Sequence, residues 1–92
     1  MQIELTKRFL AAARKLPAEE VARVDAALAV LSETFGRPHL HAGRSVRLLR
    51  KDVYELRASL AARIIFVRAG PVLRVDFVGD HDAVADYLRN RA

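Results

Sequence analysis

Residues Val53–Asp82, VYELRASLAARIIFVRAGPVLRVDFVGDHD, carry the clearest secondary-structure signal in the chain. Over Val53–Ala58, side chains alternate between two faces, which is typical of a strand with one face in the core and one toward water. Ala62–Val67 is an apolar run of β-branched and aromatic residues interrupted by one arginine, and Val72–Val78 alternates again. The Gly/Pro connection at Arg68–Pro71 favours a hairpin between the last two segments. We therefore expect three consecutive strands here.

Three arginines, Arg57, Arg63 and Arg74, fall inside these predicted strands. Arginine is rarely buried without a partner, because removing an unpaired charge from water is unfavourable. The pattern indicates either a solvent-exposed polar face or a face that binds an anion.

Two helices are expected before the strands. Thr6 is a suitable N-cap for a short helix over Lys7–Leu16. Pro17 opens a second helix, which Gly36 and Pro38 end. Because the connection is short, the two helices should lie antiparallel as a hairpin.

The rest of the chain supplies a loop, one more strand and a last helix. Arg37–Arg44 lacks periodicity and is expected to be a loop, whose two histidines do not make a metal site by themselves. Ser45–Arg50 alternates and predicts the first strand. Asp80 or Asp82 can cap a final helix over His81–Arg89.

This order of elements predicts a single α+β domain over residues 1–92. Short connections make neighbouring strands antiparallel, so the helical hairpin should cover one face of a four-stranded antiparallel sheet. The opposite face, with the three strand arginines, should be less covered. Ile65 and Val67 should then be exposed there, as an apolar surface awaiting a partner.

Charge is concentrated in the predicted sheet. The formal net charge is +5. Residues 1–36 carry five basic and five acidic groups, so their net charge is zero. Residues 37–74 carry nine basic and two acidic groups (+7), and residues 75–92 carry two basic and four acidic groups (−2). A basic patch attracts polyanions, above all nucleic acid, or an acidic protein. A solvated arginine-rich face with no ligand is the alternative.

Location is constrained by what the sequence lacks. The chain has no cysteine, which excludes disulfides and permits a reducing compartment. Its N-terminus offers no export signal, and no segment approaches the roughly 20 apolar residues of a membrane helix. We expect a cytoplasmic protein that neither spans nor binds a membrane.

Three motifs in this order resemble the RelE/ParE superfamily of bacterial type II toxins: Tyr54–Arg57 (YELR), Arg63–Phe66 (RIIF) and Gly79–Asp82 (GDHD). The resemblance covers nearly the whole chain. It implies a toxin neutralised by a cognate antitoxin. In the RelE-like branch it implies an endonuclease that cuts mRNA on the ribosome with no metal or other cofactor. The alternatives are a ParE-like inhibitor of DNA gyrase, and an inactive toxin-like binding module.

The resemblance also suggests site residues. Arg63 falls where RelE-like members place an arginine that supports the scissile phosphate, and His81 matches a histidine that some members use as acid or base. Glu55 is a second candidate base, and Tyr87 could stack or donate a proton if the last helix folds toward the sheet. Val53 and Glu55 stand where some RelE proteins have two lysines. The candidate phosphate-binding residues are Arg57, Arg74, Arg47, Arg44 and Lys51.

Structural roles compete with these assignments. His81 lies between two aspartates and can bond to one of them at the start of the helix. Arg57 with Glu55, or Arg74 with Asp76, can take part in ordinary ion pairs with neighbours on the sheet. The third ambiguous residue, Tyr87, shares one side of the last helix with apolar neighbours, which is equally typical of a core position.

Overall fold

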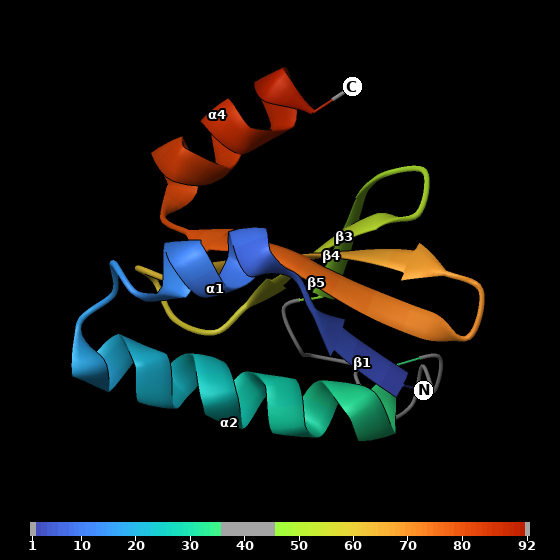
Figure 1. The fold of residues 1–92 in the computed structure, drawn as a ribbon, viewed down its shortest axis with the longest axis horizontal. Coiled ribbons are helices and arrows are strands. Elements are labelled where there is room, and N and C mark those ends of the chain that lie inside the picture. Colours follow the sequence, from blue (N-terminus) through green and yellow to red (C-terminus); the bar gives the residue numbers. More distant parts are fainter. Residues whose placement is uncertain (1, 36–45, 92) are drawn as a thin grey trace.

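The computed structural model describes residues 2–35 and 46–91, and Figure 1 shows its arrangement. The elements are β1 (Gln2–Leu5), α1 (Lys7–Ala13), α2 (Ala18–Thr34), β2 (Val46–Arg50), β3 (Val53–Arg57), β4 (Arg63–Ala69), β5 (Val72–Gly79) and α4 (His81–Asn90). In the described part of the chain, no helix has the length and apolar character needed to cross a membrane. The strands form one sheet with the order β1-β5-β4-β3-β2, in which β1 is parallel to β5 and the other neighbours are antiparallel.

The α+β class is confirmed, but the expected four-stranded antiparallel sheet is wrong in one respect. Residues 2–5 form a fifth strand, which makes the sheet mixed. Ile3 pairs with Leu73, and the amide of Thr6 donates to the carbonyl of Val75 at 3.1 Å. A four-residue strand has too little pattern to identify by itself, and here it is defined by its pairing with β5.

Helices α1 and α2 run in opposite directions and cover one face of the sheet (Figure 1). Phe9 of α1 and Leu31 of α2 are buried in one core with Ile64 and Phe66 of β4. The Thr6 cap is confirmed, since its side chain accepts a hydrogen bond from the amide of Phe9 at 3.1 Å.

The bounds of both helices differ slightly from expectation. Helix α1 ends at Ala13, because the next residues turn before Pro17. Helix α2 ends at Thr34, ahead of the expected stop. The predicted stop residues and the predicted loop, with Arg44, lie outside the described residues.

Helix α4 packs on the other face of the sheet (Figure 1), which corrects one expectation. Val84 and Tyr87 of α4 form a second core with Val53 and Ile65. Ile65 is therefore fully buried and Val67 partly buried. The expected exposed apolar surface is absent from these two positions, because the last helix folds back over them.

The loop between β3 and β4 is fastened to α2 by one carboxylate. The hydroxyl of Ser59 donates to Glu20, which also pairs with Arg23. The same Ser59 oxygen accepts from the amides of Ala61 and Ala62 at 3.2 and 3.1 Å. The Ser59 hydrogen bond, helped by Arg23, lowers the pKa of Glu20 against the opposing effect of burial.

We predict that Glu20→Gln removes part of the acid sensitivity of folding. A carboxylate whose pKa is lowered in the folded state stabilises that state above its unfolded pKa, and the effect is lost as the pH falls through the folded value. The variant should be less stable than wild type at pH 7, and the difference should shrink as the pH falls below the unfolded pKa of about 4.3, measured by urea unfolding. Glu19→Gln, an exposed neighbour, is the control. A constant difference across this pH range would contradict the prediction.

A glycine fixes how closely α4 starts above the sheet. A Cβ at Gly79 would lie 2.8 Å from the Cβ of Ala83 and 3.1 Å from the Phe77 ring. Gly70, in the β4–β5 turn, has φ +60° and open space around it.

We predict that Gly79→Ala lowers the free energy of unfolding by about 1–3 kcal/mol, because overpacking must displace α4. Gly70→Asn should change it by less than about 0.5 kcal/mol, since asparagine tolerates left-handed backbone. Urea unfolding measures both. Equal stability of Gly79→Ala and wild type would show that α4 does not pack this closely.

Candidate functional site

The buried carboxylate of Glu55 organises one end of the α4-covered face. It is only 4% exposed. Arg47 Nη2 lies 2.9 Å from Oε2, and Arg63 Nη1 lies 3.1 Å from Oε1. Each carboxylate oxygen therefore already has a guanidinium partner, and the expected pair between Glu55 and Arg57 is replaced by these two.

Arg63 is held in place but keeps unused hydrogen-bonding capacity. Its side chain is 16% exposed. Among the described residues, its Nε is the one buried side-chain nitrogen or oxygen that lacks a hydrogen-bond partner. A buried donor without an acceptor is costly, by about 1–3 kcal/mol. Because this nitrogen is buried, an external ligand does not reach it while the side chain keeps this position.

The strand register brings Arg57 and Arg63 together. They are direct cross-strand partners, and Arg63 is also paired with Gly79. Arg57 is exposed and forms no ion pair with another described residue. Like charges at such positions repel, and one carboxylate cannot neutralise three guanidinium groups. We call Arg47, Arg57 and Arg63, with Glu55, the arginine row.

His81 begins α4 at this same end of the sheet, two residues after Gly79. The helix cap is Asp80, whose Oδ1 accepts from the amide of Ala83 at 2.9 Å. His81 is exposed, and in the described structure its imidazole makes no hydrogen bond with Asp80 or Asp82. The chain order therefore places an imidazole at the same end of the sheet as the arginine row, with no hydrogen bond to either neighbouring aspartate.

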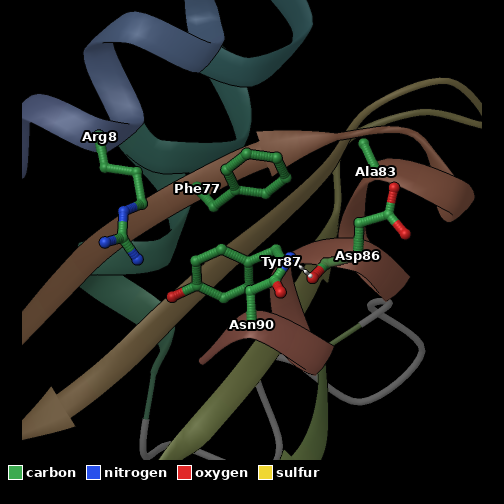
Figure 2. Close-up of a pocket in the computed structure, with 6 residues that line it drawn as sticks. All are labelled: Arg8, Phe77, Ala83, Asp86, Tyr87 and Asn90. Atoms are coloured by element: carbon green, nitrogen blue, oxygen red, sulfur yellow. Dashed lines mark hydrogen bonds between the residues drawn. The ribbon is translucent and has the colours of Figure 1, made fainter. Parts of the chain in front are cut away.

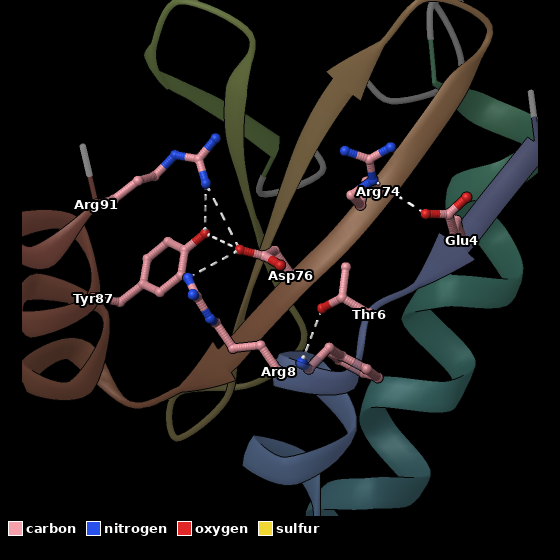
Figure 3. Close-up of polar contacts among 8 residues, drawn as sticks. Glu4, Thr6, Arg8, Arg74, Asp76, Tyr87 and Arg91 are labelled. Atoms are coloured by element: carbon pink, nitrogen blue, oxygen red, sulfur yellow. Dashed lines mark hydrogen bonds and ion pairs between the residues drawn. The ribbon is translucent and has the colours of Figure 1, made fainter.

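Tyr87 belongs to a second cluster, farther along α4. It follows His81 by six residues, which is about 9 Å along a helix. Its hydroxyl donates to Asp76 Oδ2 at 2.5 Å and accepts from Arg91 Nη1 at 3.2 Å (Figure 3). Burial first, and then the contact with Asp76, raise the pKa of Tyr87. The phenol is held neutral and is a poor candidate for a base.

The Tyr87 ring also lines a surface pocket of about 410 Å³ (Figure 2). It stacks on Phe77 with ring centroids 4.9 Å apart, and the Arg8 guanidinium lies 5.7 Å from the Tyr87 centroid. The remaining lining residues are Ala83, Asp86 and Asn90. The pocket combines an apolar floor with a polar rim.

Two predicted phosphate ligands lie away from the arginine row. Arg74 pairs with Val67, four residues along β4 from Arg63, or about 13 Å. Its Nε lies 3.1 Å from Glu4 Oε1, so the expected pair with Asp76 is wrong. Lys51 is in the β2–β3 turn, at the opposite end of β3 from Arg57.

Sequence reasoning missed the partners of Asp76. They are Arg8 and Arg91, at 3.5 and 3.7 Å from Oδ2, and the hydroxyl of Tyr87. Arg8 and Asp76 are 68 positions apart, so no local pattern links them. Across the described residues, no group of three histidine, cysteine, aspartate or glutamate side chains could hold a metal ion.

We predict that Glu55→Gln lowers the free energy of unfolding by about 2–3 kcal/mol, because the charged hydrogen bonds to Arg47 and Arg63 are lost inside the protein. Glu4→Gln, which breaks the exposed pair with Arg74, should change it by less than about 1 kcal/mol. Urea unfolding at pH 7 compares the two. Equal effects would mean that Glu55 does not organise this end of the sheet.

Comparison with known proteins gives the fold. No protein-family model and no curated protein matches the sequence. Among solved structures, the RelB–RelE antitoxin–toxin complex of Methanococcus jannaschii matches with a TM-score of 0.73 at 14% identity, over 91% of this chain and 96% of that one. YafQ from E. coli BL21(DE3) matches with a TM-score of 0.68 at 18% identity, over 90% of this chain and 96% of that one.

A third match is the YoeB/ParE toxin from Agrobacterium tumefaciens, with a TM-score of 0.66 at 16% identity, over 88% of this chain and 99% of that one. All three cover nearly the whole of both chains, so the likeness concerns the complete arrangement of helices and strands. The chain therefore has the fold of the RelE/ParE toxins.

Proposed function

We propose that this chain is the toxin of a type II toxin–antitoxin system and cleaves mRNA on the ribosome. The observation that carries the proposal is the arginine row with His81 at the same end of the sheet, on a RelE-like fold. Its protein partner is a cognate antitoxin, by analogy with the antitoxin–toxin complex that shares the fold.

The proposed reaction needs no metal. The 2′-hydroxyl of the RNA attacks the adjacent phosphorus, the bond to the 5′-oxygen breaks, and a cyclic phosphate and a 5′-hydroxyl result. The step needs a base for the 2′-proton, positive charge beside the phosphoryl oxygens and an acid for the leaving oxygen. Histidine suits proton transfer near neutral pH, so His81 takes the acid or base role.

Arg63 and Arg57 would hold the scissile phosphate. Guanidinium groups match phosphate oxygens in bidentate geometry, Arg57 is exposed, and the Arg63 side chain is 16% exposed with its Nη1 on Glu55. Glu55 orients Arg63 and Arg47 in this proposal, because both its oxygens are engaged. Tyr87 takes no part in proton transfer in this proposal, because its hydroxyl donates its proton to Asp76 in a hydrogen bond.

The test is inducible expression with mapping of the new 5′ ends of a reporter mRNA. We predict cleavage only where the reporter is translated. His81→Ala should lower the cleavage rate by about 10²- to 10⁴-fold, as for loss of a positioned acid or base. Arg63→Gln should lower it by about 10²- to 10³-fold, as for loss of a donor to the transition-state oxyanion.

Arg68→Gln is the matched control, because it removes the same charge from the exposed far end of β4. It should cleave like wild type, and circular dichroism should show that every variant is folded. Full activity of the two test variants would remove His81 and Arg63 from the mechanism. Intact reporter mRNA during growth arrest by wild type would end the nuclease proposal.

One observation favours a second candidate, inhibition of DNA gyrase as in ParE-like toxins. Glu55 neutralises part of the positive charge where a nuclease needs it, and a toxin that acts by contact alone needs no catalytic set. In a purified supercoiling assay this candidate predicts loss of gyrase activity that is insensitive to His81→Ala. Unchanged supercoiling would remove it.

A further inference from the structure

We propose a second phosphate site, built from α1, β5 and the end of α4, that binds the backbone of single-stranded RNA. The site is a pocket of about 410 Å³. It is lined by Thr6, Lys7, Arg8, Val67, Arg74, Asp76 and Arg91, and Figure 3 shows most of these residues. We call it the basic pocket.

The charges around the basic pocket do not balance. Its lining includes four cationic side chains and one carboxylate, that of Asp76. Outside the lining, Glu4 pairs with Arg74. Counting both carboxylates, the pocket retains a net charge of about +2, from four cations less two anions. This excess favours an anionic ligand.

Asp76 does not satisfy the two arginines that face it. Its Oδ2 already accepts the short hydrogen bond from Tyr87, and Arg8 and Arg91 stand at 3.5 and 3.7 Å from the same atom. Charge-assisted hydrogen bonds are usually about 2.7–2.9 Å long. The carboxylate therefore positions both guanidinium groups without using their donors fully.

The two arginines are accessible and reach Asp76 from different elements, Arg8 from α1 and Arg91 from the residue after α4 (Figure 3). Their side chains are 60% exposed for Arg8 and 28% exposed for Arg91. A phosphate at the mouth of the pocket could accept from both, with Arg74 and Lys7 on its rim. Phosphate oxygens suit this arrangement because each accepts several hydrogen bonds from guanidinium.

The basic pocket is distinct from the arginine row. Arg74 lies about 13 Å from Arg63 by their positions along the sheet, which is more than one phosphate group spans. The two sites would hold different phosphates of one strand. The choice of RNA as the ligand rests on the proposed function, whereas the choice of an anion rests on the pocket itself.

The test measures binding of a 12-nucleotide 2′-O-methyl RNA, which cannot be cleaved through its 2′-oxygen, by fluorescence anisotropy. We predict that Arg8→Gln and Arg91→Gln each weaken binding about tenfold, from the loss of charged hydrogen bonds. The double variant should also lower the slope of log K against log salt by about 0.7, one single-strand phosphate contact. Arg14→Gln, an exposed arginine at the other end of α1, should stay within about twofold of wild type.

The direction in which Asp76→Asn changes RNA affinity is the decisive test. Asparagine keeps an oxygen that can accept from Tyr87 and the two guanidinium groups, and so can still orient them. It removes the negative charge that opposes an anionic ligand, so RNA binding should tighten about threefold or more. If Asp76 and the arginines were only structural partners, this variant would bind the same or more weakly, and that result would overturn the proposal. So would equal effects of Arg8→Gln and Arg14→Gln in proteins that circular dichroism shows to be folded.

Inorganic phosphate as competitor separates the possible sources of the anion. RNA binding that depends on Arg8 and far exceeds that of free phosphate supports the proposal; equal affinity for the two would replace RNA by a small anion and overturn it. The readout is independent of cleavage. If the wild-type protein binds RNA through Arg8 but cuts no mRNA, the proposed function is wrong and the basic pocket is supported. If it cuts mRNA but its RNA binding does not depend on Arg8, the basic pocket is wrong and the proposed function is supported.

Discussion

Strand β4 must be covered on both faces, and the rest of the structure follows from that requirement. Ile64 and Phe66 face the core under α1 and α2, while Ile65 faces the core under α4, and all three are fully buried. Burial of each such side chain is worth about 1.5–3 kcal/mol. The chain therefore cannot leave α4 detached without exposing the middle of its sheet.

The docking of α4 has consequences at both of its ends. At its start, the absence of a side chain at Gly79 lets the helix begin close to the sheet, which puts His81 next to the strand end that carries Arg63. Toward its end, Tyr87 reaches Asp76 and Arg91 joins the same cluster. A packing requirement in the core thus creates two separate polar sites on one face.

Much of the fold could be predicted from the sequence because it depends on local pattern. Alternation and the apolar run identified β3, β4 and β5, and the hairpin register then makes Arg57 and Arg63 neighbours. The short connection after Gly79 likewise places His81. Strand β1 could not be found this way, since its four residues are a strand only through pairing with β5, about 70 positions later.

The candidate site was less predictable, for the same physical reason. Ion pairs between neighbouring strand positions, such as Arg57 with Glu55, were the obvious expectation, yet residues one position apart point to opposite faces, and residues two apart are separated by about 6–7 Å. Glu55 instead pairs across to β2 and β4. The partners of Asp76 come from both ends of the chain, which no spacing rule reveals.

One arrangement recurs on this face of the sheet: a largely buried carboxylate shared by two arginines. Glu55 forms ion pairs with Arg47 and Arg63, and Asp76 forms ion pairs with Arg8 and Arg91. A one-to-one pair would cancel the charge, and a lone arginine would lose side-chain entropy on being ordered by a ligand. Sharing fixes the direction of two guanidinium groups and still leaves one positive charge per cluster. Two such clusters on one face hold four guanidinium groups in fixed directions, and they explain how a domain with a positively charged sheet can remain folded.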